Sequence, residues 1–208
     1  MCDFLALITN KVIWKLHSII IKFILGIYGI KVGKKFYIEG TPKLKIRGKA
    51  GNITIGDNVS IYGDIDLRNR ENGRIIIENN VNIENDCRFV SAREGSIIIK
   101  EGAKVGCGSV FTGGADIIIG KKCMLGPRIT INANEHRLVK NEFIADQGYI
   151  HEPVIIEEDC LIGANTAINK GVKILRGSVI GANAVVTKDT ESYSINAGVP
   201  AKKIGERS

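Results

Sequence analysis

The sequence predicts an all-β protein in which short parallel strands stack as a column of triangular turns. Aliphatic residues recur at every sixth position, a period that fits neither an alternating strand nor an α-helix. In the C-terminal third, a small or β-branched residue follows four positions after each of five successive aliphatic residues. Ile and Val are plentiful, and aromatic residues make up only 6% of the chain. This composition favours strands over helices.

The aliphatic positions form groups of three, and each group corresponds to one turn of a triangular prism. We expect the aliphatic side chain to point inward and the small residue to fit a crowded corner. Seven turns stacked ~4.8 Å apart would give a column of roughly 34 Å. The upstream groups are Val32, Ile38, Leu44; Ile55, Ile61, Leu67; Ile77, Ile83, Phe89; Ile99, Val105, Phe111; and Ile119, Leu125, Ile131. The C-terminal series is Ile156, Ile162, Ile168, Ile174, Ile180 and Val186, with small residues at Cys160, Thr166, Val172, Ser178 and Ala184.

Residues 1–31 are expected to form a basic amphipathic helical segment, ahead of the repeat domain at 32–191 and a tail at 192–208. Over residues 4–27, Lys11, Lys15, Ser18 and Lys22 have the spacing of one polar stripe on a helix, and the remaining surface is wide and apolar. Each end of a stacked column needs a cover. The helix is therefore interpreted either as an end cap or subunit contact, or as an interfacial membrane helix with lysines near lipid headgroups. Both interpretations fit the sequence.

Positive charge is concentrated near the N-terminus. Residues 1–51 hold ten Lys and Arg residues against two acidic ones, in a chain of net charge +7. This distribution favours an anionic surface such as a membrane as a partner. No helix-turn-helix, zinc-finger or RNA-binding motif is present, so nucleic acid is not expected as a partner.

Neither a signal peptide nor a membrane-spanning helix is expected, because lysines interrupt the N-terminal apolar run. The five cysteines include no C-x-x-C pair, which predicts a reducing, cytoplasmic compartment. Cys87, Cys123 and Cys160 fall on small-residue positions of the repeat and are interpreted as core. Together with the basic helix, this predicts a cytoplasmic protein that can lie peripherally at the inner face of the cell membrane.

The repeat is interrupted once, by a predicted extruded loop at 133–153. A long loop on a rigid scaffold is a common place for chemistry. Two of the three histidines, His136 and His151, lie at its two roots, whereas His17 lies in the N-terminal helix and is expected to pack there. A neutral imidazole suits the removal of a proton from an attacking hydroxyl, which makes His136 the candidate catalytic base. Asn134, Glu135 or a backbone carbonyl would fix its tautomer, and His151 is a possible supporting residue.

A zinc site is the competing interpretation of these histidines. Only His136 and His151 lie near the loop, and a catalytic zinc ion usually takes three protein ligands. No metal is therefore expected. No Ser or Cys adjoins either loop histidine in the sequence, which favours direct transfer over a covalent acyl-enzyme.

With the repeat and the loop in view, the chain resembles the hexapeptide-repeat acyltransferases, whose fold is a left-handed parallel β-helix. The branch with maltose, galactoside and xenobiotic acetyltransferases, and above all the capsule and O-antigen O-acetyltransferases, is the most similar. The repeat covers about residues 32–191, and its specific part is C-terminal. That part includes Pro153-Val154-Ile155-Ile156, Ile162-Gly163-Ala164, Val185-Val186-Thr187-Lys188-Asp189 and Ala197-Gly198-Val199-Pro200-Ala201-Lys202.

The resemblance implies a homotrimer with active sites between neighbouring prisms and acetyl-CoA as co-substrate. His136 matches the catalytic loop histidine of the family. Ala164 and Ala182 match positions whose backbone groups bind the pantetheine arm. Thr187 and Lys188 match positions near the outer part of CoA, and Lys202 matches a basic position near its phosphates.

Two positions depart from the family pattern. Leu161 stands where a Trp is frequent, and Gly106-Cys107-Gly108 replaces the stretch that carries an acceptor-binding Asn in enzymes acting on maltose or galactosides. A different acceptor pocket is therefore expected. The leading hypothesis is O-acetylation of a sugar in a bacterial surface polysaccharide or its precursor. The alternatives are N-acetylation of a nucleotide-linked amino sugar or a small xenobiotic, and a non-catalytic trimeric scaffold.

Overall fold

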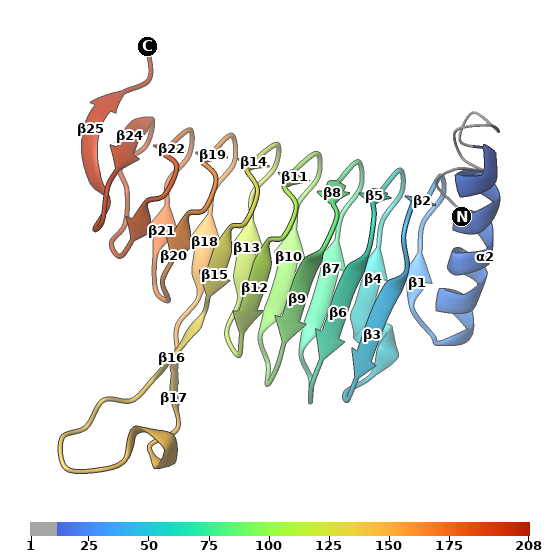
Figure 1. Ribbon diagram of the computed structural model, residues 1–208, viewed down its shortest axis with the longest axis horizontal. Helices are drawn as coiled ribbons and strands as arrows, with labels where there is room; N and C mark the ends of the chain where they lie inside the picture. The colour runs from blue at the N-terminus through green and yellow to red at the C-terminus, as the bar shows by residue number, and fades with distance from the viewer. Residues whose placement is uncertain (1–11) are drawn as a thin grey trace.

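The computed structural model describes residues 12–208, and within them the chain forms a straight column with a helix at its N-terminal end (Figure 1). Three parallel sheets make the sides of a triangular prism, and the chain visits each side once per turn. Seven complete turns run from β1 to β23. The fold is the left-handed parallel β-helix, which confirms the predicted fold class.

The three sides are called the first, second and third faces. The first face holds β1 (Lys31–Val32), β4 (Ile53–Ile55), β7 (Arg74–Ile77), β10 (Ser96–Ile99), β13 (Ile117–Ile119), β18 (Val154–Ile156) and β21 (Lys173–Ile174). The second holds β2 (Tyr37–Ile38), β5 (Ser60–Tyr62), β8 (Asn82–Glu84), β11 (Lys104–Val105), β14 (Met124–Leu125), β19 (Leu161–Ile162), β22 (Val179–Ile180), β24 (Ser194–Ala197) and an antiparallel β25 (Lys202–Glu206). The third holds β3 (Pro42–Ile46), β6 (Ile65–Asn69), β9 (Cys87–Ser91), β12 (Val110–Gly113), β15 (Thr130–Asn132), β20 (Ala167–Ile168) and β23 (Val185–Val186).

The predicted aliphatic positions form the core of the column. All of them are buried except Val32 and Leu44, which lie in the first turn and are partly buried. The small residues of the C-terminal series are buried as well, and so are Cys87, Cys123 and Cys160. Burial raises the pKa of the Cys87 thiol to about 12, as expected of an inert core thiol. The core interpretation of these three cysteines is confirmed.

Glycine at the corners lets successive turns stack closely. A Cβ atom on Gly163 would lie 2.5 Å from the backbone nitrogen of Ala182 in the next turn, and one on Gly120 would lie 2.3 Å from the carbonyl carbon of Glu157. Any larger residue would push the turns apart, since such contacts are far below van der Waals distance. The same corners use Asn in the left-handed region, for example Asn165 and Asn183, whose side chains hydrogen-bond each other at 3.1 Å.

Helix α2 (Val12–Ile27) covers the N-terminal end of the column and packs on β1 and β2. Ser18 is buried, accepts a hydrogen bond from the Ile38 N–H at 2.8 Å and donates to the Trp14 carbonyl at 2.6 Å. Lys22 donates to the Gly33 carbonyl at 2.5 Å, and a ring nitrogen of His17 lies 2.9 Å from the Gly40 carbonyl oxygen. The expected end cap and the packing role of His17 are therefore found.

The predicted polar stripe of the helix does not face solvent along its whole length. Ser18 and Lys22 instead hydrogen-bond backbone groups of the first turn. An unpaired strand edge needs such partners. The outward surface of α2 is instead apolar, with Leu16, Ile19, Ile20, Phe23 and Ile27 each between 58% and 71% exposed. The part of the predicted helix at residues 4–11, with Lys11, lies outside the described residues. Within residues 12–208, no helix has the length and apolar character needed to cross a bilayer.

Candidate functional site

The predicted loop is a β-hairpin that projects from the column at the corner between the third and first faces (Figure 1). Its strands are β16 (Asn134–His136) and β17 (Tyr149–His151), which pair antiparallel, and a short 3-10 helix η2 (Ile144–Asp146) lies near its tip. The backbone N–H of Ala133 donates to Thr112 O at 2.9 Å, and that of Glu152 donates to Ala133 O at 3.2 Å. Both roots are thus tied to the rigid column, so the side chains next to them have fixed positions.

His136, Tyr149 and His151 gather on one side of the hairpin. The ring centroids of His136 and Tyr149 are 4.1 Å apart, and those of Tyr149 and His151 are 6.1 Å apart. The Nδ1 atoms of both histidines are buried and have no hydrogen-bond partner within residues 12–208. The sequence analysis did not identify Tyr149 as a neighbour of both histidines, although its place opposite His136 follows once the hairpin register is known.

His151 packs at the base of the hairpin against Gly114, where a Cβ atom would lie 2.7 Å from its Nδ1. Burial lowers the pKa of His151, and the positive charge of Arg93 lowers it further. Both causes disfavour the imidazolium. Both therefore favour the neutral form of His151.

Glu135 and Glu152 lie on the other side of the hairpin and bind Lys170. The Lys170 Nζ is 3.1 Å from a Glu152 oxygen and 3.6 Å from a Glu135 oxygen. The hydrogen bond that Lys170 donates to Glu152 raises the pKa of Lys170, with Glu135 adding to it. Lys170 thereby ties the hairpin to the turn that follows it in the column. In the sequence, Lys170 is recognisable only as a lysine one turn after the loop, and it was not predicted to contact the hairpin.

Neither Glu135 nor Asn134 hydrogen-bonds His136 within the described chain. Glu135 points toward Lys170 because adjacent residues of a strand face opposite sides. Asn134 lines a cavity of about 100 Å³ with Asn132, Glu135, Asn169 and Lys170. The expectation that Glu135 or Asn134 orients the imidazole of His136 is therefore not met by this arrangement.

Ala164 and Ala182 stack at the corner between the second and third faces, where the Asn183 N–H donates to the Ala164 carbonyl at 2.8 Å. Within residues 12–208, the backbone N–H groups of Ala164 and Ala182 donate to no backbone acceptor. Thr187 and Lys188 are exposed directly after β23, and Lys202 is exposed on β25. The structure thus brings the two alanines together, places Thr187 and Lys188 in succession after β23, and places Lys202 next to Ala201, whose N–H donates to the Val185 carbonyl of β23 at 2.8 Å.

No group of three or more His, Cys, Asp or Glu side chains in residues 12–208 is arranged to hold a metal ion. The groups next to His136 and His151 are Tyr149, Gly114 and Arg93.

A family model described as the hexapeptide repeat of succinyl-transferase matches residues 153–188. Over these residues the chain is similar to that repeat. The matched segment contains the Ile-Gly-Ala and Val-Val-Thr-Lys motifs, so the resemblance stated from the sequence is confirmed at the level of the repeat and its left-handed β-helix.

Curated relatives of this protein include 2,3,4,5-tetrahydropyridine-2,6-dicarboxylate N-acetyltransferases from Staphylococcus aureus. They are 48% identical over 56 residues, which is 27% of this chain and 23% of the relatives' length. The aligned segment thus spans about a quarter of those proteins.

Solved structures extend the similarity over most of the chain. AntD, an N-acyltransferase from Bacillus cereus in complex with dTDP-4-amino-4,6-dideoxyglucose and coenzyme A, superposes with a TM-score of 0.62 at 22% identity, covering 86% of this chain and 83% of the other. The polysialic acid O-acetyltransferase OatWY has a TM-score of 0.56 at 24% identity, covering 85% and 88%. These solved structures share the fold of this protein.

Proposed function

We propose that this protein is an acetyl-CoA-dependent O-acetyltransferase that acts on a sugar hydroxyl of a bacterial surface polysaccharide, such as capsule or O-antigen, or of its precursor. The observation that carries the proposal is a histidine hairpin, the one large projection from a hexapeptide-repeat column in the described chain. Similar proteins support the reaction class, since AntD acylates an amino sugar and OatWY acetylates a sugar polymer.

In the proposed reaction His136 is the general base. Its imidazole removes the proton of the sugar hydroxyl while the oxygen attacks the thioester carbonyl. The tetrahedral intermediate collapses to the acetyl ester, and the CoA thiolate leaves and takes up the proton from the imidazolium. A backbone N–H of the column stabilises the oxyanion. His151 and Tyr149 pack beside His136 and act as positioning residues.

The corner at Ala164 and Ala182 fits the pantetheine arm of CoA. Small side chains let a ligand approach the backbone, and the two free N–H groups are donors for its amide carbonyls. Lys188 and Lys202 would attract the phosphates, and Thr187 would lie near the outer part of CoA. Calorimetric titration with CoA tests this, because a non-catalytic scaffold would not bind it.

The direct test is an assay of free CoA release from acetyl-CoA with polysaccharide repeat units as acceptor. We expect release that depends on the acceptor, and a product whose acetyl group is removed by mild base, as for an ester. The alternative suggested by AntD is N-acetylation of a nucleotide-linked amino sugar. Mass spectrometry of a base-stable product would favour that alternative and contradict O-acetylation.

We further propose that the enzyme is a homotrimer whose prisms associate through the first face. Four outward isoleucines form a continuous ladder on this face, namely Ile76, Ile98, Ile118 and Ile155. They are partly exposed in the single chain. A contiguous apolar stripe of this kind marks an interaction surface.

Substitution Ile98→Glu is expected to dissociate the trimer, because it places a charge in the middle of the isoleucine ladder. Light scattering after size exclusion should show the mass fall by about threefold, from trimer to monomer. The matched control is Val90→Glu on the third face of the preceding turn, which should leave the trimer intact. A variant Ile98→Glu that remains trimeric would contradict the proposed interface.

The apolar outward surface of α2 supports peripheral contact with the cytoplasmic face of the membrane, where Lys15 and the basic residues of the first turns would meet anionic headgroups. Phe23→Glu is expected to abolish co-flotation with vesicles containing anionic lipid, since Phe23 is 70% exposed on that surface. The control Phe143→Glu changes a phenylalanine on the hairpin that is even more exposed, and this variant should float normally. Flotation of both variants alike would argue against the contact.

A further inference from the structure

The outer surface of the third face is cationic in its N-terminal half, unlike the isoleucine ladder of the first face. The strand register places Lys43, Asp66 and Arg88 in one cross-strand row, and Lys45 beside Arg68 in the next row. Toward the C-terminus the first row continues with Val110. Four basic side chains and one acidic side chain therefore project from β3, β6 and β9.

Asp66 organises the arginines of this surface. Its side chain is 11% exposed and accepts hydrogen bonds from Nε and Nη2 of Arg68 at 2.8 and 2.5 Å, and from Nε of Arg88 at 3.1 Å. The bonds from Arg68 keep the pKa of Asp66 below its usual value, with the charge and hydrogen bond of Arg88 contributing in the same direction. One carboxylate thus fixes two guanidinium groups, and the trio keeps one net positive charge.

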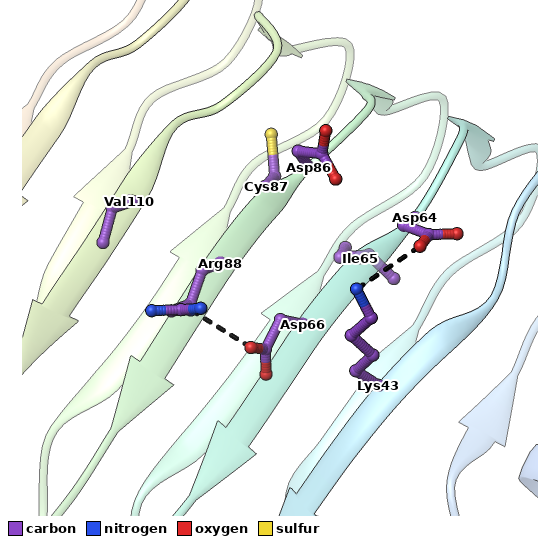
Figure 2. Close-up of a pocket in the computed structure, with 8 residues that line it drawn as sticks. All are labelled: Lys43, Asp64, Ile65, Asp66, Asp86, Cys87, Arg88 and Val110. Atoms are coloured by element: carbon purple, nitrogen blue, oxygen red, sulfur yellow. Dashed lines mark hydrogen bonds and ion pairs between the residues drawn. The ribbon is translucent and has the colours of Figure 1, made fainter.

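The guanidinium of Arg88 is hydrogen-bonded through its Nε edge only. Its side chain is 49% exposed, and its two terminal nitrogens bind no acceptor within residues 12–208. It lines a cavity of about 270 Å³ together with Lys43, Asp64, Asp66 and Asp86. Figure 2 shows Arg88 and Asp66 next to each other on neighbouring strands, with Asp64 and Asp86 nearer the corner where these strands begin.

The carboxylates at the corner balance the positive charge around the cavity, so the group that can bind an anion is the free edge of the Arg88 guanidinium. Asp64 accepts hydrogen bonds from the Thr41 N–H at 2.8 Å and lies 3.4 Å from the Lys43 ammonium, while Asp86 accepts from the Asn85 side chain at 3.0 Å. Each carboxylate retains lone pairs for further donors. The cavity thus offers a fixed guanidinium for an anion and, a few ångströms away, acceptors for hydroxyl groups.

We propose that this cavity binds an acidic sugar residue of the acceptor chain, with Arg88 on its carboxylate or phosphate and Asp64 and Asp86 on its hydroxyls. A guanidinium with two free N–H groups suits a planar or tetrahedral oxyanion. The inference rests on the proposed function and deepens it, because it assigns the acceptor to the class of anionic glycans.

The position of the cavity relative to His136 supports an extended acceptor. The third face continues from β9 through β12 to β15, which leads directly into the hairpin strand β16. Two strand spacings, about 10 Å, separate β9 from β15. A sugar chain laid across Thr112 and Asn132, which share a cross-strand row, would then pass from Arg88 to the root of the hairpin.

Calorimetric titration without acetyl-CoA tests the inference, using a hyaluronan hexasaccharide, a glycerol phosphate oligomer and neutral maltohexaose as probes. We expect one of the anionic probes to bind about tenfold or more tightly than maltohexaose, and Arg88→Gln to remove that difference. Preference for hyaluronan would identify a carboxylate as the ligand group, and preference for the glycerol phosphate oligomer a phosphate. Arg88→Lys, which keeps the positive charge but loses the paired N–H donors of the guanidinium, should bind with intermediate affinity.

The matched control is Lys104→Gln, which removes an exposed positive charge from the second face. It should leave all three affinities unchanged. Equal weakening by Arg88→Gln and Lys104→Gln, or no preference of the native protein for either anionic probe, would overturn the proposal. Thermal unfolding of each variant shows whether it is folded. His136→Ala should bind the probes normally, so loss of transfer with intact binding would bear on the proposed reaction alone.

Discussion

Replacement of His136 by alanine is expected to lower the rate of acetyl transfer by about 10²–10⁴-fold, the usual contribution of a general base. The sugar hydroxyl is a poor nucleophile until its proton is removed, and within residues 12–208 His136 and His151 are the only histidines on the hairpin. Initial rates of thiol release measure the effect. Affinity for CoA, followed by calorimetry, should not change, because the proposed CoA corner at Ala164 and Ala182 lies on another part of the column.

Two further variants make this result specific. Lys140→Ala alters an exposed residue of the same hairpin and should retain the native rate. His151→Ala should reduce the rate less than His136→Ala, because His151 is packed against Gly114 at the hairpin base. If instead His151→Ala abolished transfer while His136→Ala was fully active, the assignment of the base to His136 would be wrong.

Substitution Phe89→Ala is expected to lower the free energy of unfolding by about 3–5 kcal/mol, the range found for buried phenylalanines. Phe89 and Phe111 are fully buried and occupy equivalent positions in successive turns, with ring centroids 4.9 Å apart and planes 16° apart. Removing one ring leaves a cavity beside the other, and a column in which turns contact only their neighbours has little means of closing it. Urea unfolding followed by circular dichroism measures the change.

Phe143 provides the comparison for the core substitution. It is 83% exposed on the hairpin, so Phe143→Ala should change the free energy of unfolding by no more than about 0.5 kcal/mol. Phe89→Leu should fall between the two. A loss from Phe89→Ala as small as that from Phe143→Ala would mean that the stacked rings contribute little to the column.

The core of this fold could be predicted residue by residue, because a six-residue period assigns every aliphatic side chain to the inside of the column. The same periodicity says nothing of how a hairpin folds on itself. The separation of His136 from Glu135 onto opposite sides, and the partnership of Glu135 with Lys170, depend on strand pairing across residues 134–151. A sequence period carries no information on that pairing.

The orientation of α2 could not be predicted from the sequence either. An amphipathic pattern predicts that polar residues face solvent, yet Ser18 and Lys22 are drawn to the unpaired backbone of the first turn. The arginine site on the third face could have been found in advance. Lys43, Asp66 and Arg88 recur at intervals of 22 to 23 residues, the length of one upstream turn, so the register that predicts the core also aligns them.

The bonds from α2 to the first turn have a consequence for how copies of the chain can meet. A parallel ladder with open edges is a template on which further strands can add without limit. On the second face, Ser18 and His17 occupy hydrogen-bonding groups of Ile38 and Gly40 at one edge, while the antiparallel β25 covers β24 at the other. A parallel turn of another molecule therefore cannot pair directly with β2 or β24, so head-to-tail continuation of the parallel ladder is hindered and association is directed to the flanks of the prism.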